Sequence, residues 1–93
     1  MVVENKMPFA VLVCGSGIGM CMTANRFHGI RGAVLRSFND ARLSREHNDA
    51  NVACFGGRFT KPQEAEQLLE TFLKTAFEGD RHIARIQKID SLT

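Results

Sequence analysis

The chain has 93 residues, of which 44% are hydrophobic and 24% are charged, and it carries a formal net charge of +2. This length fits a single domain over residues 1–93, and the composition is that of a folded globular protein rather than a disordered or fibrous one. The basic residues are scattered, which disfavours nucleic acid as a partner, and the longest apolar run is too short to cross a membrane. The first fifteen residues lack the basic start and cleavage site of a signal peptide, so we expect a cytoplasmic location.

Apolar runs and helical patterns alternate three times along the chain. This alternation predicts βα units that build a parallel sheet with helices on both faces, an α/β fold of three layers (α/β/α) that is Rossmann-like. The predicted strands are residues 9–14, 30–35 and 51–55. The predicted helices are residues 18–27, residues 40–47 and a third that begins after Thr60, followed by a short tail over residues 81–89.

Several local features accompany these elements. The strand 9–14 should be buried on both faces, as parallel strands usually are. Gly29 is placed for a left-handed turn after the first helix. Asn39 or Asp40 can cap the second helix, and Thr60-Lys-Pro-Gln is a capping-box pattern before the third. Residues 2–6 look like the last turn of a further helix.

Three strands are fewer than a sheet of this kind normally contains, and such a sheet has two open edges. We therefore expect one edge to be covered by another segment, and residues to be missing before Met1.

The three cysteines form neither a CxxC pair nor a Cys/His metal-binding spacing, so we predict no disulfide and no metal site. Cys21 and Cys54 lie within predicted elements and are interpreted as small buried apolar residues. Cys14 differs from them, because it ends a strand and opens the glycine-rich loop Cys14-Gly-Ser-Gly-Ile-Gly-Met.

Glycines at positions 15, 17 and 19 allow a tight turn that presents backbone N–H groups to an anion at the start of a helix. These N–H groups and the helix dipole also lower the pKa of a nearby thiol, so Cys14 can act as a base or nucleophile. The alternative is that Cys14 is simply a small residue at a tight turn. The loop matches neither the Walker pattern nor the dinucleotide fingerprint.

Two further clusters contain residues that can take part in catalysis or in binding a phosphate. His47 can act as a general acid or base with Asn48 beside it to hold a hydroxyl or carbonyl, although the same residues can be turn and capping chemistry. Arg81 and Arg85 are one helical turn apart and can form a fork for a phosphate, or they can belong to a solvated helix face.

Five segments taken together are more specific than any one of them. They are Cys14-Gly-Ser-Gly-Ile-Gly-Met with Ala24-Asn-Arg, then Gly29-Ile-Arg-Gly-Ala, Ser44-Arg-Glu-His-Asn-Asp-Ala-Asn-Val, Phe55-Gly-Gly-Arg and Phe77-Glu-Gly-Asp-Arg-His. In order and spacing they resemble the ribose-5-phosphate isomerase B family, which also includes the subunits of galactose-6-phosphate isomerase. The resemblance extends from about Phe9 to Ile89.

The resemblance implies an aldose–ketose isomerase that interconverts ribose 5-phosphate and ribulose 5-phosphate through an enediolate, without metal or organic cofactor. Such a reaction needs a base beside the carbon and donors around the oxygens. By resemblance, Cys14 is the base, and some members instead use a glutamate where this chain has Met20. Ser16 and the backbone of the loop surround the developing charge, the loop residues being Gly15, Gly17, Ile18 and Gly19.

The resemblance also assigns residues outside the loop. His47 opens the sugar ring, Asn48 and Arg58 contact the substrate, and Arg81 and Arg85 bind its phosphate. Family active sites combine residues of two subunits, which implies a homodimer or higher oligomer.

The chain departs from the family at its start. Full-length members begin with a strand that ends in an Asp-His pair, then a helix and a second strand, and these are absent here. The family's five strands have the order 2-1-3-4-5, so the strands of this chain would be the last three and lie side by side in chain order.

Other functions remain open. The chain could be a galactose-6-phosphate isomerase subunit, or a truncated module that binds a sugar phosphate or a partner without catalysis. A nucleotide-binding domain would be expected to place an acidic residue after the second strand, where Arg36-Ser-Phe-Asn-Asp is ambiguous.

Overall fold

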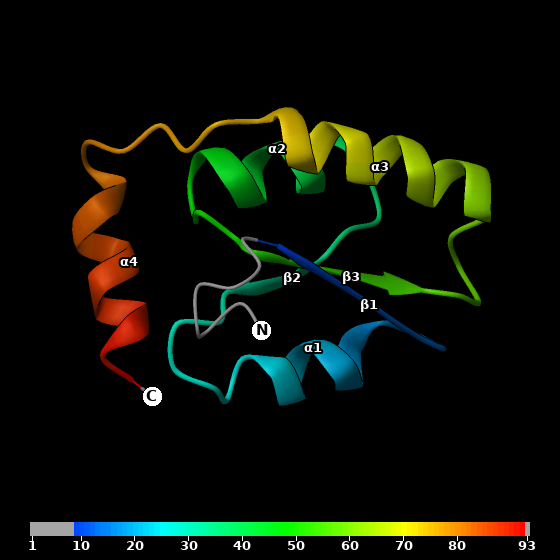
Figure 1. Ribbon diagram of the computed structural model, residues 1–93, viewed down its shortest axis with the longest axis horizontal. Coiled ribbons are helices and arrows are strands. Elements are labelled where there is room, and N and C mark those ends of the chain that lie inside the picture. Colours follow the sequence, from blue (N-terminus) through cyan, green and yellow to red (C-terminus); the bar gives the residue numbers. More distant parts are fainter. Residues whose placement is uncertain (1–8, 93) are drawn as a thin grey trace.

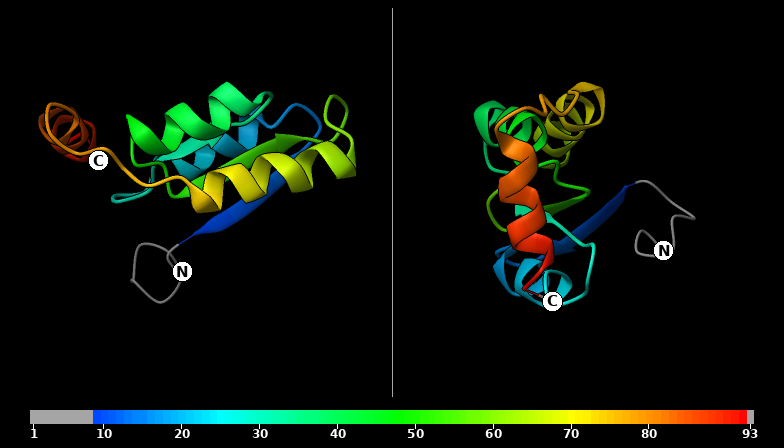
Figure 2. Two further views of the ribbon diagram at one scale, coloured as in Figure 1. Left: turned by 90° about the horizontal axis from the view of Figure 1, so that it is seen from above. Right: turned by 90° about the vertical axis from the view of Figure 1, so that its left-hand side faces the viewer.

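The computed structural model describes residues 9–92, so the helical turn expected at residues 2–6 lies outside the described residues. The elements in this part are β1 (Ala10–Cys14), α1 (Ile18–Ala24), β2 (Gly32–Val34), α2 (Phe38–Glu46), β3 (Val52–Gly56), α3 (Pro62–Lys74) and α4 (His82–Asp90). Helices α2 and α3 cover one face of the sheet, and α1 covers the other (Figures 1 and 2). The predicted three-layer α/β/α arrangement is confirmed.

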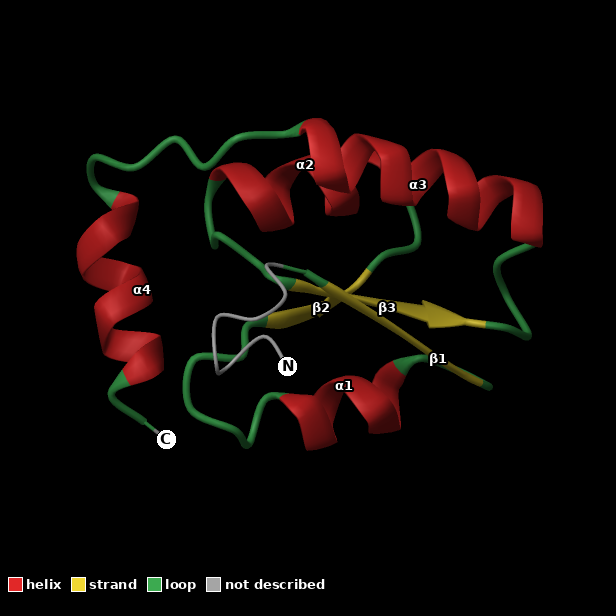
Figure 3. Cartoon of the chain, in the orientation of Figure 1, coloured by secondary structure: helices red, strands yellow, loops and turns green. Residues whose placement is uncertain are grey.

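The three strands form a parallel sheet in the order β1-β3-β2 (Figure 3). Ala10 pairs with Val52 and Cys14 with Gly56 along β1, while β2 pairs with the first three residues of β3. The expected side-by-side order of consecutive strands is therefore wrong. All five residues of β3 are buried, and a strand this continuously buried belongs in the middle of the sheet, whereas β2, with three residues, lies at an edge.

Two hydrophobic clusters hold the layers together. Between the sheet and α2 and α3, the buried residues are Leu35, Ala41, Ala50, Ala53, Phe55, Leu68 and Phe72. Between the sheet and α1, they are Cys21, Val52 and Cys54. Alternate residues of β3 thus point to opposite clusters, and the interpretation of Cys21 and Cys54 as buried apolar residues is confirmed.

Strand β1 is only half buried, contrary to the expectation for residues 9–14. Leu12 packs against the cluster on the α1 side, but the side chains of Val11 and Val13 are 46% and 62% exposed. The two valines face the other side of the sheet, where helices cover β3 but leave this edge strand open.

The first helix ends three residues earlier than predicted, at Ala24 rather than Phe27. The side chain of Asn25 leaves the helix and pairs with both backbone groups of Gly32, accepting its N–H at 2.6 Å and donating to its carbonyl at 3.0 Å. Gly29 does adopt the predicted left-handed conformation, with φ of 81°.

The predicted helix caps are also displaced. Helix α2 begins at Phe38 and is capped by Ser37, whose Oγ accepts the N–H of Asp40 at 3.1 Å, while the Asp40 carboxylate accepts the N–H of Arg36. The Ser37–Asp40 hydrogen bond is one half of the capping box expected at Thr60, while the Asp40 carboxylate bonds to Arg36 and not to Ser37. Helix α3 instead begins with Pro62 after Lys61, without a side-chain cap, because proline at the first helical position needs no N–H partner.

Candidate active site

Cys14 lies at the carboxyl edge of the sheet, where β1 passes into α1. Its Sγ accepts the backbone N–H of Gly17 at 3.1 Å. The backbone N–H of Met20, then those of Gly17, Ser16 and Gly19, lower the pKa of the Cys14 thiol below its ordinary value, against a smaller opposing effect of desolvation. This direction agrees with the prediction that the loop favours the thiolate, and the role of Cys14 in a reaction stays a prediction.

The loop is pressed against the end of β3. Gly17 has φ of 81°, and a Cβ atom there would lie 3.0 Å from backbone atoms of Phe55 and Gly56. A Cβ atom on Gly56 would lie 2.6 Å from the carbonyl oxygen of Ser16. Because only glycine fits these two positions, the loop holds Cys14 in one place relative to β3.

Polar groups surround the same loop. The Ser16 hydroxyl accepts the N–H of Ile18 at 3.2 Å, and the backbone of Arg58 donates to the carbonyl of Gly15 at 3.1 Å. The Arg58 guanidinium also lies against Gly15, since a Cβ atom built there would be 3.2 Å from Nε. Gly19 and the Ile18 side chain are exposed, so the loop faces solvent on that side.

Arg36 is a second cation at this edge and was not among the predicted site residues. Its Nη2 donates to the carbonyl of Ser16 at 3.4 Å, and its guanidinium lies 4.9 Å from the ring centre of Phe59. Its position just after β2, at the carboxyl edge of the sheet, is the signal that could have identified it.

The other predicted site residues lie at the opposite end of the sheet. His47 is the C-terminal cap of α2, and Asn48 follows it just before the chain enters β3. Arg81 immediately precedes α4, and Arg85 lies in the first turn of that helix. Figure 1 shows α4 beside the end at which the strands begin. Asn48, Arg81 and Arg85 are all exposed.

The structure therefore divides the predicted site between two edges. Cys14, Ser16, the loop glycines and Arg58 lie together at the carboxyl edge, and His47, Asn48, Arg81 and Arg85 lie together at the amino edge. The five residues of β3 separate these edges by about 15 Å. Cys14 and His47 of one copy of the chain therefore lie too far apart to contact the same small molecule.

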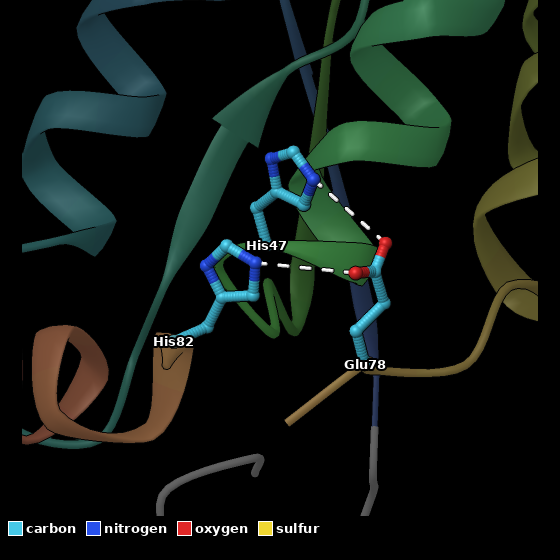
Figure 4. A group of neighbouring side chains, drawn as sticks. All are labelled: His47, Glu78 and His82. Atoms are coloured by element: carbon cyan, nitrogen blue, oxygen red, sulfur yellow. Dashed lines mark ion pairs between the residues drawn. The ribbon is translucent and has the colours of Figure 1, made fainter. Parts of the chain in front are cut away.

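His47 has neighbours that the sequence did not single out. Its ring stacks on that of His82, with centroids 4.5 Å apart and planes 16° from parallel. The two carboxylate oxygens of Glu78 lie 3.8 Å from His47 Nε2 and 4.0 Å from His82 Nε2 (Figure 4). Burial, followed by the charge of Arg81, lowers the pKa of His82. Their proximity to Arg81 in sequence was the available signal for Glu78 and His82.

A cavity of about 300 Å³ also opens at the amino edge, between the end of α1, β2 and α4. Among the predicted site residues it is lined by Asn48 alone. Arg31, on its wall, pairs with both carboxylate oxygens of Asp90 and with Asp49, so its charge is already compensated.

Comparison with known proteins places this arrangement in context. The sequence pattern of the family described as Ribose/Galactose Isomerase matches residues 1–89. The chain is 42% identical to the probable ribose-5-phosphate isomerase B of Mycoplasma pneumoniae over 85 residues, which cover 91% of this chain and 56% of that protein. It is 39% identical to ribose-5-phosphate isomerase B of Escherichia coli over 82 residues, 88% of this chain and 55% of that one. The chain thus spans little more than half the length of these relatives.

Solved structures give the same result for the fold. A ribose 5-phosphate isomerase from Thermotoga maritima matches 97% of this chain and 62% of its own, with a TM-score of 0.94 and 43% identity. Ribose-5-phosphate isomerase B from Mycoplasma genitalium, solved with bound ribulose-5-phosphate, matches 98% of this chain and 60% of its own, with a TM-score of 0.92 and 40% identity. Within residues 9–92 the longest helix, α3, has 13 residues, and none has the length and apolar character of a bilayer-spanning helix.

Proposed function

Because the chain belongs to the ribose/galactose isomerase family, we propose that it carries most of the catalytic groups of an aldose–ketose isomerase for ribose 5-phosphate and ribulose 5-phosphate. The observation that carries this proposal is the thiol of Cys14 held among backbone N–H groups at the carboxyl edge of the sheet. The relatives named for this reaction, one of them with bound ribulose-5-phosphate, support the choice of substrate.

Cys14 acts as the base in this mechanism. Its thiolate removes the proton from C2 of the open-chain aldose, and the electrons of that C–H bond form the C1–C2 double bond while the carbonyl oxygen at C1 takes up negative charge. N–H groups at residues 16–20 stabilise this enediolate. Return of the proton from Cys14 to C1, with transfer of the O2 proton to O1, gives the ketose.

Ser16, Gly15 and Arg58 contribute to the same half of the site. The Ser16 hydroxyl and the backbone of residues 15–19 contact the oxygens on the reacting carbons, and Arg58 contacts the substrate beside Gly15. Arg36 adds a second positive charge at this edge.

A second subunit supplies the other half in this proposal. His47 opens the sugar ring, Asn48 holds a hydroxyl, and Arg81 and Arg85 bind the phosphate. Since these side chains lie at the amino edge of their own chain, they reach a Cys14 loop only across an interface. The active form is therefore a homodimer or higher oligomer.

Two other functions rest on specific observations. The family includes galactose isomerases, so a galactose-6-phosphate isomerase subunit keeps the chemistry and changes the sugar. The chain covers 56% of a curated relative, so a non-catalytic module that binds a sugar phosphate or a partner is the third candidate.

Proton exchange and turnover measured by NMR in D2O test the proposal. The purified chain is incubated with ribose 5-phosphate, and parallel samples contain Cys14→Ala and the matched cysteine control Cys21→Ala. We expect ribulose 5-phosphate and deuterium at the reacting carbon with the wild type and with Cys21→Ala, and neither with Cys14→Ala.

Circular dichroism and sedimentation establish whether each sample is folded and associated. A folded, associated chain that binds ribose 5-phosphate without exchange would overturn the isomerase proposal in favour of a binding module. Turnover of galactose 6-phosphate but not of ribose 5-phosphate would favour the galactose enzyme.

A further inference from the structure

The buried residues of α4 lie on one face of the helix. His82 and Ile86 are buried, and the half-buried Asp90 follows four positions later, so these three residues share one stripe. Arg81 and Arg85 occupy the neighbouring stripe and are exposed. Figure 1 shows α4 at the side of the molecule, joined to α3 by an extended segment. The place of the two arginines therefore depends on what holds the buried stripe.

The two ends of this stripe are held in different ways. At its start, the ring of His82 stacks on that of His47, with centroids 4.5 Å apart. At its end, Nη1 of Arg31 donates to both carboxylate oxygens of Asp90, at 3.1 and 3.2 Å. The side chains of Arg31 and Asp90 are 16% and 31% exposed, so this charge-assisted pair is partly shielded from water. Stacked rings can slide over each other, so the ion pair supplies the directional contact.

Arg31 is itself held firmly by the body of the protein. Its backbone N–H donates to the side-chain oxygen of Asn51 at 2.8 Å, and its Nε donates to the carbonyl of Asp49 at 3.0 Å. Its Nη2 pairs with the Asp49 carboxylate at 3.4 Å, and the same carboxylate pairs with the buried Arg45. The guanidinium is thus fixed between the start of β2 and the turn before β3.

We propose that Arg31 is a positioning residue for the phosphate-binding arginines: through Asp90 it sets the direction of α4 and so the place of Arg81 and Arg85. The inference rests on the proposed function, which assigns the substrate phosphate to those two arginines. Arg31 acts through them and not on the phosphate, because its Nε, Nη1 and Nη2 all bond to Asp49 or Asp90.

The geometry of a helix shows how the far anchor controls Arg85. With a rise of ~1.5 Å per residue, Arg85 is about 4.5 Å along the axis from His82, and Asp90 is about 12 Å from it. A swing of about 3 Å at Asp90 around His82 therefore moves Arg85 by about 1 Å. Misplacing a substrate-positioning group by about 1 Å can reduce a rate by about 10²-fold. Loss of the ion pair thus weakens phosphate binding although every group that touches the substrate is still present.

Asp90→Asn tests the anchor, since it removes the charge and nearly keeps the shape of the side chain. Amide hydrogen exchange reports on α4 directly. We expect the α4 amides to exchange at least about tenfold faster in this variant, and those of the central strand β3 to change much less. The matched control is Glu66→Gln, which removes one exposed carboxylate from α3 and should change neither.

Binding of ribose 5-phosphate, measured by calorimetry in a Cys14→Ala background without turnover, tests the consequence. We expect Asp90→Asn to raise the dissociation constant about tenfold and Glu66→Gln to leave it unchanged. In a further Arg85→Ala background, Asp90→Asn should have a much smaller effect, because the anchor acts through that arginine.

Steady-state kinetics with Cys14 in place separate positioning from stability. Asp90→Asn should raise KM about tenfold and change kcat less than about twofold, whereas partial unfolding removes active molecules and lowers kcat at unchanged KM. Unchanged exchange of α4, an unchanged dissociation constant, or a lower kcat at unchanged KM would overturn the inference and leave the proposed function standing. Absence of ribose 5-phosphate binding by the Cys14→Ala parent would overturn both.

Discussion

At the level of single residues, the three cysteines differ in what surrounds their sulfur atoms. Burial, with the neighbouring Cys21 thiol, raises the pKa of Cys54 to about 12, which makes it an unreactive core group. Cys21 is buried as well. Cys14 alone is half-buried, and backbone N–H groups lower its pKa. The difference follows from position, because Cys14 ends a strand at a glycine loop while the others lie inside elements.

We predict that Cys14 reacts with iodoacetamide as a thiolate at unusually low pH. The rate of alkylation follows the thiolate fraction, so its midpoint should fall below the ordinary thiol value of 9.0. The expected low-pH limb of any isomerase activity lies at the same pH, because the base must be deprotonated. Mass spectrometry of the modified peptide at a series of pH values gives the midpoint.

A substitution in the glycine-rich loop tests whether the loop causes the lowered pKa of Cys14. Gly17→Ala forces a side chain into a left-handed conformation and against the backbone of Phe55, which should displace the loop and raise the midpoint toward 9.0. A wild-type midpoint equal to that of the urea-unfolded chain would contradict the account.

Residue-scale prediction from sequence succeeded where chemistry follows from local position. The low pKa of Cys14 follows from a strand end and three glycines, and both are visible in the chain. Arg36 and Glu78 were missed because their roles depend on what folds against them, Ser16 in one case and two histidines in the other.

At the level of elements, α2 is tied to its neighbours by a buried arginine. Arg45 donates to the carbonyl of Thr75 after α3 at 3.1 Å and to that of Ala50 before β3 at 2.7 Å, and it pairs with Asp49. Its guanidinium also lies over the ring of Phe9, 5.0 Å from the ring centre. One side chain therefore joins the ends of α2 and α3 to the start of β3.

We predict that Arg45→Ala lowers the free energy of unfolding by about 2–4 kcal/mol, because it leaves two carbonyls unsatisfied and removes packing from the core. The matched control is Arg42→Ala, one turn earlier in the same helix. Arg42 is 50% exposed and pairs only with Glu46 among the residues that the structure describes, so its loss should cost about 0.5 kcal/mol or less.

Urea unfolding followed by circular dichroism measures both variants. Equal effects of the two substitutions would show that Arg45 does not join these elements as described.

The sequence was enough to predict that these strands and helices exist. It was a weaker guide to which strands lie side by side and to the residues at which each element begins and ends. The alternation of apolar runs and helical patterns is local, and all three βα units were found from it. Strand order depends on which strand the rest of the molecule buries most completely, and Val52–Gly56 became central for that reason. Ser37, rather than Asn39 or Asp40, caps α2, since its Oγ accepts the N–H of Asp40 while the Asp40 carboxylate accepts that of Arg36.

For the whole molecule, the parallel sheet explains why the site is divided. Every site residue named from the sequence lies at one of the two ends of the strands, but the motifs do not state which end. The path of the chain through α2 carries it from the carboxyl edge back to the amino edge, so Cys14 and His47 separate. For this reason the proposed mechanism takes the two halves of the site from two subunits.

The open edge of β1 has its own consequence for association. Within residues 9–92 no strand pairs with the outer side of β1, and Val11 and Val13 expose apolar surface beside it. Unpaired edge strands with apolar side chains promote association between chains, and a lysine on such a strand opposes it. We predict that the chain associates as its concentration rises, and that Val13→Lys shifts it toward the 10.3 kDa monomer.

Analytical ultracentrifugation over a range of concentrations tests this prediction. Met22→Lys on α1 is the matched control, since Met22 is 68% exposed against 62% for Val13 but lies away from the strand edge. The control should associate like the wild type. If Val13→Lys also associates unchanged, the chains meet through another surface. The next surface to test would then be the proposed interface that joins the two halves of the site, with the variant Arg85→Glu. A sharp monomer at high concentration in the wild type would refute both the open edge as an association surface and the shared site.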